Sequence, residues 1–102
     1  MAKPIAIIMV TADWEKASSY IKKACKKVAE ELNLELEERK EDYEFLDKYG
    51  VKNEFGGLDI PQVFIKYDDG EIKYVISRVP LTPRGTPDLE AAVNIIKKAA
   101  GG

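Results

Sequence analysis

A proline stands at the entrance of the most strongly β-forming stretch of this chain, the run IPQVFI from Ile60 to Ile65. Proline has no N–H and a fixed φ, so a strand tolerates it only at its first residue or at a sheet edge. We therefore predict that a strand begins here and continues over Val63 to Tyr67. The residues Asp68 to Gly70 are typical of a tight hairpin turn, so a second strand, from Ile72 to Val79, should pair with the first in antiparallel fashion.

The N-terminal half predicts a strand, a helix and a second strand joined by a parallel crossover. Ile5 to Val10 is almost continuously apolar, which is typical of a strand buried on both faces of a sheet. Asp13 is the expected N-cap of a helix that runs to about Leu32, with apolar residues at three- and four-residue spacings. Leu34 to Glu37 alternates between apolar and charged residues, so we expect an edge strand with one face in water.

The rest of the chain supplies two further helices. Asp42 is a suitable cap for a short helix, and Gly50 is expected to end it in the left-handed conformation, before a loop from Val51 to Asp59. Thr86 as N-cap and Pro87 at the first helical position predict a final helix. The residues expected on its buried stripe are Leu89, Val93, Ile96 and Ala100. The sum is a single α/β domain over residues 1–102 with the order βαβαββα, in which helices cover a four-stranded mixed sheet.

Histidine is absent and cysteine occurs once, at Cys25, in a chain of 102 residues. The commonest general base and metal ligand is therefore missing, and we expect no metal site and no cofactor. A net charge of −2 with both signs interspersed provides no basic field that would hold nucleic acid. The longest apolar run is too short to span a bilayer, and the start of the chain lacks the apolar region of a signal peptide, so we expect a cytoplasmic protein.

Three short segments, taken in chain order, resemble the thioredoxin-like superfamily. The segment ADW (residues 12–14) is similar to the Ala-x-Trp before the redox cysteines of that family, and KYGV (residues 48–51) resembles its helix-ending Lys-Tyr-Gly-Val. The segment from Pro61 to Ile65 closely resembles a glutaredoxin strand. The resemblance covers nearly the whole chain, and it implies a thioredoxin-like fold in which Pro61 is cis and lies against the active site.

The chain departs from that family at the residues that carry its chemistry. Glu15 and Ser18 occupy the two cysteine positions, and neither can form a disulfide. Dithiol exchange needs a thiolate near a helix N-terminus and a second sulfur that resolves the mixed disulfide. The segment Lys52–Ile60 is longer than its counterpart in the family, and the glutaredoxin Gly-Gly after the hairpin is missing. The resemblance thus implies the frame of the family without its redox activity or glutathione binding.

Five residues have both a structural and a functional interpretation. Cys25 lies on the apolar stripe of the first helix, so packing is favoured over a reactive thiol. The helix dipole stabilises an ionised carboxylate at Glu15, and this interpretation is favoured over a general-base role. Ser18 has no histidine to activate its hydroxyl, so an ordinary helix position is favoured over a nucleophile. Trp14 either packs against the core, which is favoured, or stays exposed as a binding anchor. Arg84 either belongs to an ordinary strand-to-helix connection, which is favoured, or faces an anion at the helix N-terminus.

We expect a redox-inactive binding module that takes a protein or peptide partner and is a monomer or a weak dimer. In the resemblance, the backbone beside the proline pairs with an extended peptide, a mode of strand addition that needs no cysteine. The alternative is a monothiol oxidoreductase that uses Cys25 for thiol-disulfide or peroxide chemistry. A third possibility is self-association through the edge strand Leu34–Arg39, whose glutamates oppose such pairing. The expected binding residues are Asp13, Trp14, Glu15, Ser18, Ile60, Pro61 and Arg84, the last within the Leu81–Arg84 loop.

Overall fold

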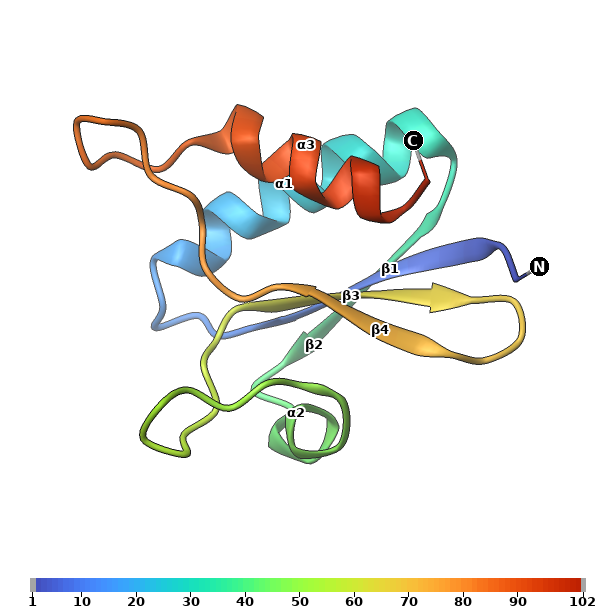
Figure 1. Cartoon of the computed structure of the whole chain (residues 1–102), viewed down its shortest axis with the longest axis horizontal. Helices are drawn as coiled ribbons and strands as arrows, with labels where there is room; N and C mark the ends of the chain where they lie inside the picture. Colours follow the sequence, from blue (N-terminus) through green and yellow to red (C-terminus); the bar gives the residue numbers. More distant parts are fainter. Residues whose placement is uncertain (1, 102) are drawn as a thin grey trace.

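A four-stranded mixed sheet runs through the middle of the molecule, which the computed structural model describes over residues 2–101 (Figure 1). The strand order is β2-β1-β3-β4, with β1 and β2 parallel and the other two neighbouring pairs antiparallel. In chain order the described residues form β1 (Pro4–Thr11), α1 (Ala17–Leu32), β2 (Glu35–Lys40), α2 (Tyr43–Tyr49), β3 (Gln62–Tyr67), β4 (Ile72–Ile76) and α3 (Leu89–Ala99). The α/β class, the order of elements and the mixed sheet are those that the sequence predicts.

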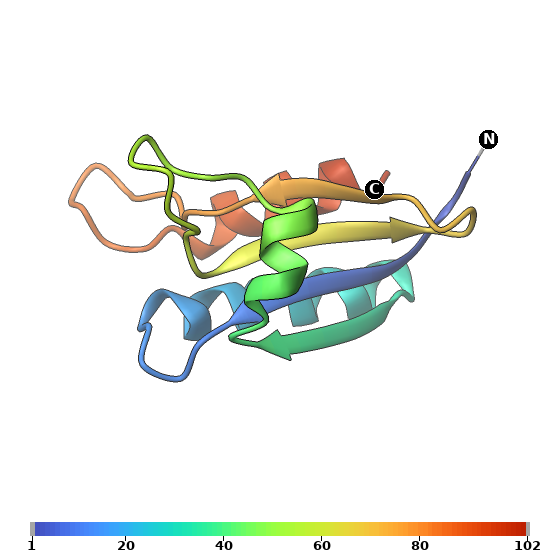
Figure 2. The same cartoon turned by 90° about the horizontal axis from the view of Figure 1, so that it is seen from below.

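Helices lie on both faces of the sheet. Figures 1 and 2 show α1 and α3 side by side over one face and α2 alone across the other. The side chains of β1 alternate between these two layers: Ile7 belongs to the buried cluster that contains Cys25 of α1, and Ile8 to the cluster that contains Phe45 of α2. The continuous apolar run of β1 is explained by its central position, because both of its faces are buried.

Local signals predicted the short helix and the hairpin correctly. The Asp42 side chain caps α2 by accepting a hydrogen bond from the Phe45 N–H at 3.0 Å. Gly70 has φ 89° in the turn between β3 and β4, a conformation that glycine adopts without steric cost. β4 ends at Ile76 rather than at the predicted Val79. The ladder stops there because β3 is preceded by Pro61, which has no N–H to donate.

The helix α1 begins later than predicted, at Ala17. Asp13 is not its N-cap, since it lies in the turn that follows β1. Two other side chains form the junction: the Glu15 carboxylate accepts a hydrogen bond from the Ala17 N–H at 3.2 Å, and the Ser18 hydroxyl accepts one from the Ala12 N–H at 3.1 Å. These bonds tie the end of β1 to the first turn of the helix and leave Asp13 in solvent.

The start of α3 also differs from the prediction. Asp88, not Thr86, is the N-cap, and its side chain accepts a hydrogen bond from the Ala91 N–H at 3.0 Å. Thr86 instead closes the preceding loop, because its hydroxyl shares a hydrogen bond of 2.7 Å with the hydroxyl of Thr82. Pro87 therefore lies before the helix rather than in its first turn.

Two predictions about local environment are corrected as well. Gly50 is extended, with φ −80° and ψ 173°, and not left-handed. It is needed for space, because a Cβ at this position would lie 2.7 Å from the carbonyl oxygen of Leu46. The buried stripe of α3 is as predicted, except that Leu89 is half-buried and Ala92 is fully buried.

Candidate functional site

An open groove lies at one end of the molecule, on the left in Figure 1, where three loops meet. These loops are the turn between β1 and α1, the residues before β3, and the segment between β4 and α3. The groove has a volume of about 460 Å³, which lies within the range of small ligand-binding clefts. Its apolar walls include Tyr20, Ile60, Pro61, Val79, Leu81 and Pro87.

The Ile60-Pro61 peptide bond at the entry of β3 is cis, as the resemblance implies. Both residues line the groove, and Pro61 is buried whereas Ile60 is half-buried. Neither the N–H nor the C=O of Ile60 forms a backbone hydrogen bond within residues 2–101, because ladder pairing of β3 begins only at Gln62. One backbone donor and one backbone acceptor are therefore left at the wall of the groove, and these are the groups that an added strand requires.

The groove brings together three of the predicted binding residues, namely Glu15, Ile60 and Pro61. Ser18 is not among them, because it is buried and its hydroxyl is engaged with the backbone at the end of β1. Arg84 is exposed in the segment between β4 and α3, beside a glycine that lines the groove. Ser18 thus has a structural role, and Arg84 lies at the rim.

Asp13 and Trp14 lie against the end of β2 rather than in the groove. Asp13 forms an ion pair with Lys40 at 3.2 Å, and the indole N–H of Trp14 donates to the Glu41 carboxylate at 2.9 Å. Trp14 is 64% exposed, so the favoured prediction that it packs in the core is wrong. The reason is that α1 starts after this residue, which places Trp14 in a surface turn outside the apolar stripe of the helix.

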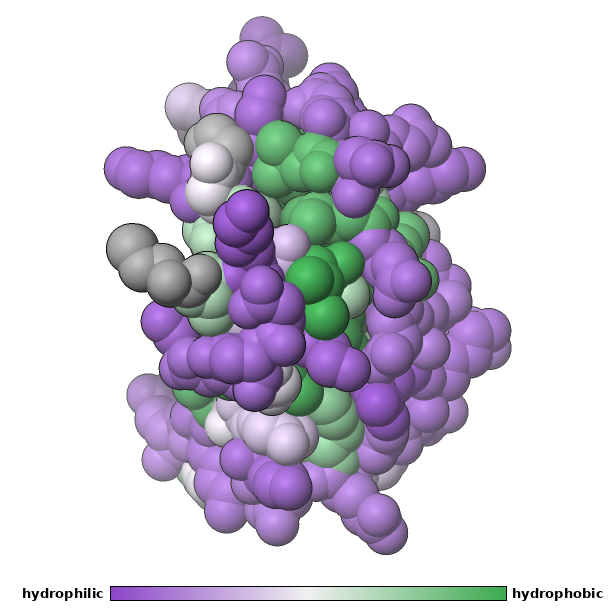
Figure 3. Space-filling model, turned by 90° about the vertical axis from the view of Figure 1, so that its right-hand side faces the viewer, coloured by the Kyte–Doolittle hydropathy of each residue, from purple (hydrophilic) through white to green (hydrophobic). Residues whose placement is uncertain are grey.

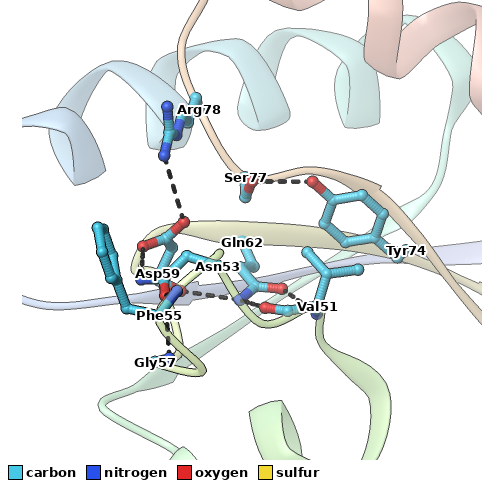
Figure 4. Close-up of polar contacts among 9 residues, drawn as sticks. All are labelled: Val51, Asn53, Phe55, Gly57, Asp59, Gln62, Tyr74, Ser77 and Arg78. Atoms are coloured by element: carbon cyan, nitrogen blue, oxygen red, sulfur yellow. Dashed lines mark hydrogen bonds and ion pairs between the residues drawn. The ribbon is translucent and has the colours of Figure 1, made fainter.

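A buried carboxamide holds the loop that forms one side of the groove (Figure 4). Gln62 is fully buried, and its Oε1 accepts a hydrogen bond from the Val51 N–H at 3.1 Å. Its Nε2 donates to the carbonyl oxygens of Val51 and Asp59 at 3.1 and 2.9 Å. One side chain thereby closes both ends of the Val51–Asp59 loop.

Asn53 organises the tip of the same loop. Its Oδ1 accepts hydrogen bonds from the N–H groups of Phe55 and Gly57 at 2.9 and 3.0 Å, and its Nδ2 donates to Asp59 at 3.1 Å. Phe55 is 89% exposed, and Figure 4 shows its ring standing clear of the polar contacts around it. A large aromatic side chain is thus held in solvent on an ordered turn.

Asp59 links this loop to the opposite wall of the groove. One of its carboxylate oxygens accepts the hydrogen bond from Asn53, and the other lies 4.0 Å from the guanidinium of Arg78 (Figure 4). The neighbouring Ser77 accepts a hydrogen bond from the Tyr74 hydroxyl at 2.9 Å. The groove therefore combines apolar walls with charged and hydroxyl groups.

Cys25 does not line the groove. It is fully buried in the layer between α1 and the sheet, and burial raises the pKa of its thiol to about 12. Almost no thiolate is present at neutral pH under these conditions, and the thiolate is the reactive form. This position agrees with the packing interpretation of Cys25.

Four residues of the site were not predicted from the sequence: Asn53, Gln62, Ser77 and Arg78. Gln62 carries a usable signal, because a carboxamide inside an apolar strand is tolerated only where it satisfies other polar groups. Asn53 lies in ordinary loop sequence, and Ser77 and Arg78 lie where the sequence predicts the end of a strand but the structure has a loop. Their roles depend on contacts between segments that are far apart along the chain.

A second hollow, of about 410 Å³, lies between α1 and α3. Its walls include Lys23, Lys27 and Lys97, of which Lys97 forms an ion pair with Glu31 at 3.1 Å. Helices satisfy most of their backbone hydrogen bonds internally, so these walls offer no row of free backbone groups to an extended chain. For this reason we consider the groove at Pro61 the better candidate site.

Hydrophobic residues also reach the surface at the opposite end of the molecule, where Figure 3 shows them bordered by hydrophilic ones. β2 is an edge strand, as predicted. Leu36 on this strand is 38% exposed, but the neighbouring Glu35 is exposed as well. Charged side chains on an edge strand disfavour pairing with a second copy.

Comparison of the chain with protein-family models, with curated proteins and with solved structures finds no match. Among residues 2–101, no three potential metal ligands come together. Within the same residues, no helix combines the length and the apolar character needed to cross a membrane. The groove itself is thus the basis for a functional proposal.

Proposed function

We propose that this chain is a thioredoxin-like protein without a redox dithiol, which binds an extended peptide segment of a partner protein in the groove at Ile60. The order βαβαββα and the sheet order β2-β1-β3-β4 support the thioredoxin-like part of the proposal. The position of Pro61 directly before β3, where it lines the groove together with the start of α1, supports it further. Glu15 and Ser18, at the family's cysteine positions, leave binding as the available function.

The unpaired backbone of Ile60 is the observation that carries the proposal. Within the described residues its N–H and C=O groups form no backbone hydrogen bond, and the residue lines a groove with apolar walls. A peptide in extended conformation can exchange two hydrogen bonds with one such residue, as strands do in a ladder. Its side chains would then contact Tyr20 and Val79, which both line the groove and supply apolar contact area.

No observation favours the monothiol alternative in the same way. Cys25 is 0% exposed and its thiol pKa is raised to about 12 by burial. A catalytic thiol needs access to its substrate and a thiolate at the working pH. Cys25 meets neither condition in the folded chain.

Peptide selection followed by mapping tests the proposal. Random heptapeptides displayed on phage are selected on the immobilised full chain, and an enriched peptide is then titrated into the ¹⁵N-labelled chain. We expect the largest amide shift changes at Ile60, Val79 and Leu81. Shift changes centred on α2 or on the opposite end of the sheet would contradict the proposal.

Two tyrosines provide a matched pair of variants. Tyr20 lines the groove, whereas Tyr43 lies on α2, on the other face of the sheet, and is 48% exposed. Tyr20→Ala should weaken binding of the selected peptide by about tenfold, the usual effect of removing an aromatic contact at an interface. Tyr43→Ala should leave it unchanged. Equal effects of the two substitutions would exclude binding in the groove.

A further inference from the structure

The exposed charges at the rim of the groove are positive. Lys16 and Arg78 line the groove, and Arg84 lies in the loop beside it. The Arg78 side chain is 81% exposed, and its nearest carboxylate is 4.0 Å away, at the outer limit of an ion pair. Lys16 forms no ion pair within residues 2–101.

The two carboxylates that line the same groove are already engaged by the chain. Glu15 accepts a hydrogen bond from the Ala17 N–H at the start of α1, where the helix dipole also favours a negative charge. Asp59 accepts one from Asn53 and faces Arg78. The groups left free to interact with a ligand are therefore mainly cationic, although the formal charges of the lining residues balance.

The lining of the groove also includes a hydroxyl donor. The Ser77 oxygen accepts the hydrogen bond of the Tyr74 hydroxyl at 2.9 Å, which leaves the Ser77 O–H itself free to donate. Ser77 lines the groove next to Arg78 (Figure 4). A guanidinium and a hydroxyl donor on adjacent residues suit a carboxylate, which only accepts hydrogen bonds when it is ionised.

We infer that the groove selects extended peptide segments in which an apolar side chain is followed or preceded by aspartate or glutamate. The apolar side chain occupies the space between Tyr20 and Val79, and the adjacent carboxylate faces Arg78, Ser77 and Lys16. This inference rests on the proposed function and adds the class of segment that the groove prefers. Charge complementarity decides between this occupant and a basic or uncharged segment.

The peptides selected from the random library test the inference directly. We expect enrichment of Asp and Glu next to a large apolar residue, and binding that weakens as salt is added, since salt screens exposed charges. The variant Arg78→Glu should weaken binding of an enriched acidic peptide by about fivefold, because it replaces an attraction at the rim with a repulsion. A peptide with Lys in place of its acidic residue should regain affinity for this variant.

Lys98→Glu is the matched control, because it makes the same change of charge at an exposed position near the end of α3. Two results would overturn the inference and leave the proposed function standing. In the first, the selected peptides map to Ile60 and Val79 but show no preference for acidic residues. In the second, they bind the Arg78→Glu variant with the same affinity as the Lys98→Glu variant. Failure to select any peptide that maps to the groove would overturn both.

Discussion

The side-chain amide of Gln62 pairs with the backbone of Val51 as one strand residue pairs with another. Its Oε1 accepts from the Val51 N–H and its Nε2 donates to the Val51 C=O, both at 3.1 Å. Gln62 is also the first residue of β3 and follows the cis Ile60-Pro61 bond. A single buried side chain thereby fixes the position of the Val51–Asp59 loop relative to the strand that forms the wall of the groove.

Gln62→Leu is expected to destabilise the chain strongly. The substitution leaves the Val51 N–H and the carbonyl oxygens of Val51 and Asp59 without their partner, and each unsatisfied buried group costs about 1–3 kcal/mol. We expect the free energy of unfolding to fall by about 3 kcal/mol in urea titrations, because solvent can reach part of the opened loop. Asn94→Leu, which changes an exposed amide on α3, is the control. A loss no larger than that of the control would mean that the loop is held by other contacts.

Gly50→Ala should destabilise the same region for a steric reason. A Cβ at residue 50 would lie 2.7 Å from the Leu46 carbonyl oxygen and 2.8 Å from Gln62 Oε1, so the backbone or the carboxamide must shift. We expect a loss of about 1–3 kcal/mol in the free energy of unfolding, as is typical of overpacking. The loss should be smaller in a Gln62→Ala background, where one of the two clashes is removed, and thermal unfolding of the four chains measures this coupling. Purely additive effects would contradict the contact.

The predictions from sequence that succeeded depend on signals within a few residues. The strand that begins directly after Pro61, the hairpin at Gly70 and the cap at Asp42 each follow from the conformational limits of one residue and its neighbours. The start of α1 could not be decided in this way: Asp13 is a residue type that commonly caps helices, but the helix begins only at Ala17. The junction is formed by contacts between the end of β1 and the first turn of the helix, where the Ser18 hydroxyl accepts a hydrogen bond from the Ala12 N–H and the Glu15 carboxylate accepts one from the Ala17 N–H.

The candidate site was predicted in part. Glu15, Ile60 and Pro61 were expected there because of the resemblance to the thioredoxin-like superfamily, and the three residues line the same groove. Arg78 could not be foreseen, because its role depends on β4 ending at Ile76 and on the chain then turning over the groove. Exposed loop residues carry no periodicity that reports their neighbours in space.

Native Cys25 should react very slowly with iodoacetamide. Its thiol pKa is about 12 in the folded chain, against about 8.5 for an unperturbed cysteine, so at pH 8 the thiolate is at least a hundredfold scarcer than in the unfolded chain. Mass spectrometry of labelled protein, with and without guanidinium chloride, measures the ratio of rates. Ser19→Cys in a Cys25→Ala background places a thiol at an exposed position on the same helix and serves as the reactive control. Rapid labelling of native Cys25 would instead favour the monothiol alternative.

Glu38 should make stability depend on pH in the acidic range. Partial burial acts to raise the pKa of its carboxyl, but hydrogen bonds from Lys22 and from the buried Thr11 hydroxyl outweigh this effect, and the pKa is lowered. The ionised carboxylate therefore stabilises the fold above its unfolded pKa of about 4.3, and this contribution is lost as the pH falls through the lower folded value.

Glu38→Gln measures that contribution. The variant should be less stable than the parent chain at pH 7, and the difference should shrink towards zero as the pH falls below about 4, because the parent carboxyl is then protonated as well. Thr11→Val should cost about 1 kcal/mol at pH 7 through the loss of one hydrogen bond. Glu30→Gln, at an exposed position of α1, is the control. A difference between Glu38→Gln and the parent that stays constant with pH would contradict the lowered pKa.

Substitutions of Asn53 and of Phe55 should show separately what the side-chain hydrogen bonds of the loop and its exposed aromatic ring contribute to stability. Asn53→Ala removes the acceptor of the Phe55 and Gly57 N–H groups and the donor to Asp59, so we expect a loss of about 1 kcal/mol and faster hydrogen exchange at Gly57. Phe55→Ala removes a side chain that is 89% exposed and should change the free energy of unfolding by less than about 0.5 kcal/mol. Exchange at Gly57 that is slow in both variants would show that the turn is ordered by its backbone hydrogen bonds alone. A marked loss of stability in Phe55→Ala would show that the ring packs against the chain in solution.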